Sequence, residues 1–217
     1  MKLNRLSIVL GVIILCSFTL VSCKDDKKES EQIRLETERV EMENAKKAED
    51  EKMAMKAKED ELKREEARSN SIAGKAMKNS DLTTLVSALE STDLSTMLSE
   101  PGDYTIFAPS NQAFNKLSEK EREELMMPEN KERLKNVLQY HMLPGKISSD
   151  RLASVIKSNN NSYKVNTVTG EEVTLMMSGD QYIIKDGSGK KAQVILGNQE
   201  ASNGIIYIID TVLMAKR

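Results

Sequence analysis

The feature that most limits how this chain can fold is a highly charged stretch at residues 24–68. Twenty-nine of these 45 residues are charged, and residues 30–68 contain neither Gly nor Pro. Apolar side chains are too sparse there to form a core, whereas Glu, Lys, Ala, Met and Arg all favour helix. We therefore expect a solvated spacer in this stretch and a folded domain in residues 69–217.

Charge pairs at helical spacing support a helix within the spacer. Glu59 and Lys63, for example, stand four residues apart, and each such pair adds about 0.2–0.5 kcal/mol. Ile33 and Val40 are seven residues apart, but the apolar pattern fails in the next heptad, so no sustained coiled-coil seam is present. The spacer is expected to be a single charged helix, roughly 60 Å long if fully helical. A disordered tether would serve the same role.

The amino-terminal residues have the pattern of an export signal. A basic start precedes an apolar run from Leu6 to Val21, which is a little short for a membrane-spanning helix. The run ends in Leu20-Val21-Ser22-Cys23, which resembles the lipobox of bacterial lipoproteins. Residues 1–22 are therefore predicted to be a lipoprotein signal peptide, and Cys23 to be the lipidated amino terminus, with acyl chains such as palmitate. An uncleaved anchor and a simple cleaved signal are the alternatives.

The residues after Cys23 bear on location. Lys24-Asp25-Asp26 resembles the signal that sends lipoproteins of the Bacteroidetes group to the cell surface, although it also fits the start of the charged spacer. We expect an outer-membrane lipoprotein of the bacterial cell envelope, exposed at the surface. Cys16 would leave with the signal, so the domain has no thiol left and must be stable without disulfides.

The charge balance excludes one class of partner. The chain has 32 basic and 34 acidic residues, for a net charge of −2. Nucleic-acid binding by phosphate neutralisation requires a basic excess or a basic stripe. We therefore expect no nucleic-acid partner.

Residues 69–217 carry helical patterns first and strand patterns later, an order that predicts an α+β fold. Asp81 is expected to cap a helix whose apolar face starts at Leu82, and Ser118 with Glu121 has the spacing of a capping box. Ser110 is expected to cap another helix. Further short helices are expected at residues 71–77, from Asp93, through Leu134–His141 and at Asp150–Ile156.

Runs of β-branched and aromatic residues predict the strands, and Gly-containing turns separate them. Gly187-Ser188-Gly189-Lys190 is one such turn; it lacks the spacing of a phosphate-binding loop. The expected strands are Tyr104–Ala108, Tyr163–Val168, Glu172–Met177, Gln181–Lys185, Gln193–Leu196 and Gly204–Asp210.

Three blocks give a specific resemblance. Thr105–Phe114 (TIFAPSNQAF), Val137–Lys146 (VLQYHMLPGK) and Ser202–Leu213 (SNGIIYIIDTVL) resemble, in order and spacing, the signature blocks of fasciclin domains. The resemblance covers residues 80–214. It implies a wedge-shaped β-sandwich with helices packed on one side, which agrees with the order of elements above.

The closing block also carries structural expectations. The run Ile205–Ile209 is apolar on both faces, so this strand should be central. Asn203-Gly204 is expected to form a turn in which positive φ costs little. Asp210 is expected to tie the end of the strand to backbone donors in the first block.

The inventory of reactive groups argues against an enzyme. His141 is the only histidine, no thiol remains in the domain, and nothing marks a nucleophile elbow. The residues show no clustering typical of a metal site, and no cofactor is expected. We expect no catalytic residues, and His141 is better explained as a packed or capping residue.

The resemblance indicates candidate residues for binding a partner. In animal fasciclin domains, the Tyr-His block and an Asp-Ile pair before the closing block are implicated in integrin binding. Tyr140 and His141 match the first, but Asn198-Gln199-Glu200 stands where the Asp-Ile pair would be. Integrin binding is therefore not carried over. Tyr140 and His141 are candidate partner-binding residues that could equally hold the fold.

Together these features predict a lipid-anchored surface protein whose fasciclin-like domain mediates adhesion, self-association or contact with a protein or matrix partner. One alternative is a carrier of a small ligand such as a pigment or lipid. Another is a structural lipoprotein that links components of the envelope.

Overall fold

The computed structural model describes residues 26–216, and their side chains from Ser30 onward. The predicted signal peptide, Cys23 and the Lys24-Asp25 pair lie outside the described residues. The chain divides into two compact units, residues 1–57 and 58–217.

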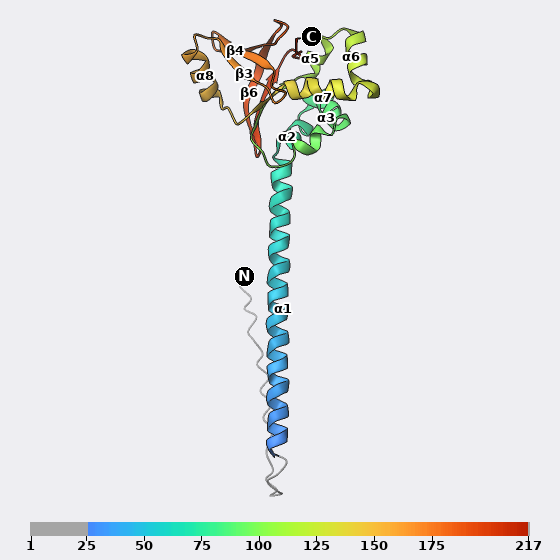
Figure 1. Ribbon diagram of the computed structural model, residues 1–217, viewed down its shortest axis with the longest axis vertical. Coiled ribbons are helices and arrows are strands. Elements are labelled where there is room, and N and C mark those ends of the chain that lie inside the picture. Colours follow the sequence, from blue (N-terminus) through green and yellow to red (C-terminus); the bar gives the residue numbers. More distant parts are fainter. Residues whose placement is uncertain (1–25, 217) are drawn as a thin grey trace, which may run out of the picture. The chain divides into compact units, whose positions relative to one another are not determined.

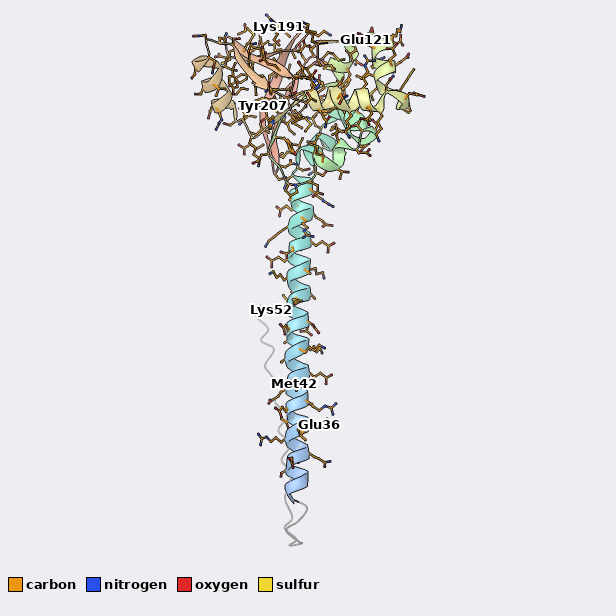
Figure 2. All side chains as sticks on the ribbon, in the orientation of Figure 1. Glu36, Met42, Lys52, Glu121, Lys191 and Tyr207 are labelled. Atoms are coloured by element: carbon orange, nitrogen blue, oxygen red, sulfur yellow. The ribbon has the colours of Figure 1, made fainter. Side chains whose placement is uncertain are left out.

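The charged spacer forms a single helix, α1 (Asp26–Ser69). Every side chain from Ser30 to Ser69 is exposed, and Glu36, Met42 and Lys52 project from different sides of the helix in Figure 2. Lys63 and Glu59 form the expected pair, with Nζ and Oε1 2.7 Å apart. Such an exposed pair contributes only a few tenths of a kcal/mol, so helix-favouring composition must supply much of the stability.

Residues 71–216 form an α+β domain, in which all the helices precede the run of strands from β3 to β7, and this confirms the predicted class. The helical elements are α2 (Ile72–Met77), η1 (Ser80–Leu82), α3 (Thr83–Ser91), α4 (Leu94–Met97), α5 (Asn111–Asn115), α6 (Glu119–Met126), η2 (Pro128–Asn130), α7 (Lys131–Tyr140) and α8 (Ser149–Ser158). The strands are β1 (Tyr104–Pro109), β2 (Met142–Pro144), β3 (Tyr163–Asn166), β4 (Glu172–Ser178), β5 (Gln181–Lys185), β6 (Lys191–Ala201) and β7 (Gly204–Ile209).

Two of the three predicted helix caps are confirmed and one is wrong. Ser110 accepts a hydrogen bond from Ala113 N, and Ser118 with Glu121 forms the capping box of α6. Asp81 lies inside η1, which Asn79 caps, so it does not cap α3. The short helix expected from Asp93 is confirmed as α4, which Asp93 precedes with φ of 61° and without a side-chain cap bond.

The cap of α3 comes from a distant residue. Asn111 Oδ1, at the start of α5, accepts a hydrogen bond of 2.9 Å from Thr84 N. Asn111 Nδ2 also donates to the Ser80 carbonyl, at 2.9 Å. A first-turn N–H that needs an acceptor can find it anywhere in the fold, which is why the local sequence pointed to the wrong residue.

The seven strands form one mixed sheet in the order β2-β1-β7-β6-β5-β4-β3. β1 and β7 are parallel, and every other neighbouring pair is antiparallel. β7 lies between β1 and β6 with all six residues buried, so its predicted central position is confirmed. β2 was not predicted, because only three residues pair with β1, too few to show a pattern.

Two register shifts in β6, between Val194 and Leu196 and between Leu196 and Gln199, interrupt its pairing with β7. Bulges bend a strand and increase its twist. β6 therefore joins two halves of the sheet, β2-β1-β7 on one side and β5-β4-β3 on the other. The halves face each other across one apolar cluster, to which β7 contributes Ile205, Tyr207 and Ile209 and the other half contributes Val173, Leu175 and Ile184.

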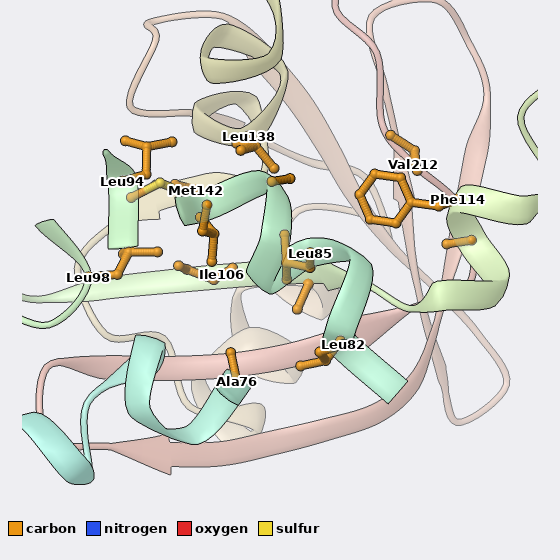
Figure 3. Close-up of a cluster of buried hydrophobic side chains, with 14 of the residues drawn as sticks. Ala76, Leu82, Leu85, Leu94, Leu98, Ile106, Phe114, Leu138, Met142 and Val212 are labelled. Atoms are coloured by element: carbon orange, nitrogen blue, oxygen red, sulfur yellow. The ribbon is translucent and has the colours of Figure 1, made fainter. Parts of the chain in front are cut away.

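The second apolar cluster lies between the other face of β1 and β7 and the helices. Ile106 and Ile206 meet Leu85, Leu138 and other side chains there (Figure 3). In Figure 1, α3, α5, α6 and α7 lie on one side of the strands, as the resemblance implied. α8 is the exception: Leu152 and Ile156 pack it into the cluster between the two halves of the sheet.

Two details expected of the closing block are wrong. A turn does join β6 to β7 at Ser202 and Asn203, but neither Asn203 nor Gly204 has a positive φ. Asp210 does not bond to the backbone of the first block: its Oδ1 accepts from Gln193 N of β6 at 2.8 Å, and its Oδ2 from Lys116 Nζ at 2.7 Å. Burial alone would raise the pKa of Asp210, but these hydrogen bonds and the Lys116 charge outweigh it and lower the pKa.

Candidate functional site

Tyr140 and His141 lie together at the carboxyl end of α7, and both side chains are buried. The Tyr140 hydroxyl donates to the Glu172 carbonyl at 3.1 Å and accepts from Gly187 N at 2.9 Å. Burial raises the pKa of Tyr140, although the hydrogen bond from Gly187 acts against this, so the hydroxyl stays protonated and able to donate.

His141 uses both ring nitrogens within the domain. Its Nε2 accepts a hydrogen bond of 2.9 Å from Leu213 N, and its Nδ1 lies 2.7 Å from the Val137 carbonyl. This pairing requires the proton on Nδ1. Burial lowers the pKa of His141 to about 4, against the smaller opposing effects of the Val137 carbonyl and Asp186. At neutral pH the ring is therefore uncharged.

Asp186, at the end of β5, is a buried carboxylate with four donors. Its Oδ1 accepts from Ser188 N, Ser188 Oγ and Lys190 N at 2.7–3.0 Å, and its Oδ2 accepts from Met214 N at 3.0 Å. The first three bonds form the tight turn between β5 and β6, as predicted for residues 187–190. The fourth attaches the carboxyl-terminal segment to that turn.

These three side chains therefore hold one part of the domain together. His141 and Asp186 bind consecutive amides of the carboxyl-terminal segment, at Leu213 and Met214. Tyr140 binds the turn at Gly187. The geometry assigns Tyr140 and His141 the structural role that the sequence left open, and a partner-binding role for them stays a prediction.

A surface groove of about 950 Å³ opens above this cluster, with Tyr140 among its lining residues. α6 and α7, the β3–β4 and β5–β6 turns and the carboxyl-terminal segment contribute its walls. Grooves of about 300–1,000 Å³ are typical of small-molecule sites. The other lining residues are Glu121, Arg133, Asn136, Val137, Thr169, Glu171, Ser188, Lys190, Met214, Ala215 and Lys216.

A second cavity lies inside the helical core and has no room for a ligand. Its free volume is about 20 Å³, enough for about one water molecule. Its lining is apolar apart from His141, and includes Ile106, Leu138 and Met142. A ligand of small-molecule size would therefore not fit in this core cavity.

Other kinds of site are not found in the part of the chain that the structure describes. Residues 26–216 hold no group of three or more His, Cys, Asp or Glu side chains placed to bind a metal ion. Across the same residues, no helix combines the length and apolar character needed to cross a membrane.

The family model described as "Fasciclin domain" matches residues 80–215. The chain belongs to the fasciclin domain family. The protein sll1483 of Synechocystis is 38% identical over 138 residues, which are 63% of this chain and 68% of the relative. The cell surface glycolipoprotein MPB83 of Mycobacterium bovis is 29% identical over 147 residues, 66% of this chain and 60% of the relative.

In two further matches, the similar region is only part of a longer protein. Human periostin is 27% identical over 147 residues, which are 66% of this chain but 16% of periostin. A solved FAS1 domain pair from the insect cell adhesion molecule Fasciclin I matches with a TM-score of 0.59 and 19% identity, over 67% of this chain and 51% of that one. That structural match shows the shared fasciclin fold.

The sequence led to Tyr140 and His141 in this fasciclin domain but missed Asp186 and the groove. Asp before Gly-Ser-Gly was a usable signal, because Asp side chains often accept hydrogen bonds from the turn that follows them. The groove gave no such signal. Its walls come from five segments between residues 121 and 216, and only the fold brings them together.

The role of Tyr140 can be tested by removing its hydroxyl. Tyr140→Phe loses one donor and one acceptor, and we expect the free energy of unfolding to fall by about 1–2 kcal/mol in urea titrations. Tyr163→Phe is the matched control, because the Tyr163 hydroxyl has no hydrogen bond within residues 26–216, and should change stability by less than about 0.5 kcal/mol. Equal effects of the two changes would contradict the structural role.

Proposed function

We propose that this chain is a lipid-anchored surface protein of the bacterial envelope whose fasciclin domain mediates adhesion or protein–protein interaction through the groove. The groove is the observation that carries the proposal, since its volume of about 950 Å³ far exceeds the 20 Å³ of the core cavity. The similarity to a cell surface glycolipoprotein and to a cell adhesion molecule supports the location and the class of function.

Binding fits this domain better than catalysis. A catalytic base needs a free nitrogen or carboxylate within reach of substrate, whereas both nitrogens of His141 bond to the backbone. The buried carboxylate of Asp186 is likewise occupied by four donors. We therefore propose a role without a chemical step.

The adhesion proposal is tested by removing the domain while keeping the proposed anchor and spacer. Cells that express residues 1–68 alone should attach to surfaces and to one another less than cells with the full chain. Equal surface amounts of the two proteins, measured by labelling of intact cells, are the required control. Unchanged attachment would contradict adhesion; if the envelope were weakened instead, a structural lipoprotein would be favoured.

The proposed anchor is tested separately at Cys23. Cys23→Ser should abolish incorporation of labelled palmitate into the protein, because the Cys23 thiol is the proposed attachment point of the acyl chains. A variant that still incorporates the label, or a parent protein that does not, would argue against lipidation at Cys23.

A small-ligand carrier is the second candidate, because the groove volume of about 950 Å³ suits a molecule of that size. The core cavity of about 20 Å³ does not. Mass spectrometry of the protein purified from its own cells without detergent should then detect a bound molecule, and its repeated absence would argue against this candidate.

A further inference from the structure

The groove contains more positive than negative charge. Arg133, Lys190 and Lys216 line it, together with Glu121 and Glu171. Among the described residues, Lys190 and Lys216 have no ion-pair partner within 4.0 Å. Arg133 has only a long ion pair, with 3.8 Å between its Nη1 and Glu124 Oε2. These cations are available to a ligand.

The two carboxylates are already engaged inside the domain. Glu121 accepts hydrogen bonds from Ser118 N at 3.2 Å and Ser118 Oγ at 2.8 Å in the capping box of α6. Glu171 accepts from Thr169 Oγ1 at 3.2 Å. Part of their capacity to repel an anion is thus offset by local donors, and a negatively charged group has the better electrostatic complement in this groove.

The remaining lining residues describe the rest of the ligand. Val137, Met214 and Ala215 offer apolar surface, and methionine adapts readily to different shapes. Asn136 adds a side-chain amide able to donate hydrogen bonds. A mixture of apolar wall and a few polar groups is typical of sites that bind small organic molecules.

We propose that the groove binds an organic carboxylate of small-molecule size, with its carboxylate between Lys190 and Lys216 and its apolar body against Val137, Met214 and Ala215. This inference rests on the second candidate function above, the small-ligand carrier, because the groove is the same site, and it names the chemical class of ligand. The carboxyl-terminal wall is preformed, since His141 and Asp186 fix the amides of Leu213 and Met214.

Three probes that share an eight-carbon chain but differ in the charge of their head group test the charge requirement: octanoate, octanol and octylammonium. Each is titrated into the ¹⁵N-labelled chain from Lys24 onward, which keeps the spacer, and backbone amide shifts are followed. Octanoate should shift the amides of Val137, Lys190 and Met214, and bind at least about tenfold more tightly than either other probe. Equal binding of octylammonium would overturn the proposal.

Charge reversal locates the carboxylate. Lys190→Glu and Lys216→Glu should each weaken octanoate binding by about tenfold or more. Lys157→Glu is the matched control, because Lys157 is an exposed residue of α8 that does not line the groove. Octanoate binding that survives both groove reversals unchanged would overturn the proposal. Unperturbed amide spectra of the free variants establish that they remain folded.

The outcome separates this inference from the adhesion proposal. If an acidic peptide binds the groove and octanoate does not, the proposal of a small-molecule ligand is overturned and a protein partner is favoured. Cell attachment could be lost on deletion of the domain but kept in Lys190→Glu and Lys216→Glu. That result would support adhesion and show that the two groove lysines do not contribute to it.

Discussion

Replacement of Gly204 by alanine is expected to destabilise the domain by more than about 3 kcal/mol. Gly204 begins β7 and pairs with Tyr104 of β1. A Cβ atom at this position would overlap the Tyr104 carbonyl oxygen and the Ile72 side chain. The Tyr104 oxygen belongs to the backbone of a neighbouring strand in the middle of the sheet, so it cannot move aside cheaply.

Gly179→Ala is the matched control for this prediction. Gly179 lies in the β4–β5 turn with φ of 61°, and a Cβ atom there would meet nothing within 4 Å. Alanine should cost only about 1 kcal/mol, from its poorer fit to positive φ. Urea unfolding of both variants measures the difference, and a Gly204→Ala protein as stable as Gly179→Ala would show that β1 and β7 are not packed as closely as described.

Mild acid is expected to destabilise the domain through His141. Burial lowers the pKa of the folded-state imidazole to about 4, whereas in the unfolded chain it is 6.5. Above pH 6.5 the ring is neutral in both states and stability does not depend on it. As the pH falls below 6.5, the unfolded state binds a proton that the folded state excludes, at about 1.4 kcal/mol per pH unit. The loss should reach about 2 kcal/mol at pH 5 and about 3 kcal/mol at pH 4.

The histidine contribution can be isolated because His141 is the only histidine in the sequence. Free energies of unfolding are measured from pH 7 to pH 5, where most carboxylates remain ionised. His141→Gln should be less stable than the parent at pH 7, since the bonds to Leu213 and Val137 are disturbed, but nearly insensitive to pH across this interval. A parent protein whose stability stays constant from pH 7 to pH 5 would contradict the buried, neutral imidazole.

Local patterns in the sequence predicted much of the fold. The Ser110 cap and the Ser118–Glu121 capping box depend on residues within one turn of a helix, and both were correct. The β5–β6 turn was correct for the same reason, because Asp186 bonds to residues two and four positions ahead. The central place of β7 followed from its lack of any polar face.

Errors arose where a residue depends on a distant partner. Asn203 and Gly204 were expected to serve a turn with positive φ, as this pair often does. In the structure, Asn203 bonds instead to Ile72 N and to the Leu98 and Glu100 carbonyls, all at 2.8–2.9 Å. Gly204 is required by the close approach of Tyr104. Nothing within a few residues of the pair reveals either contact.

By itself, the sequence determined which part of the chain folds and to which class and family that part belongs. Hydrophobic periodicity, turn residues and composition act over a few neighbours, so they can be read directly from the order of residues. Tertiary structure alone decided that Tyr140 and His141 are buried supports, that Asp186 fastens the carboxyl-terminal segment, and that Arg133, Lys190 and Lys216 meet at one groove. These arrangements bring together residues tens of positions apart, and only the packing of the sheet against the helices fixes those distances.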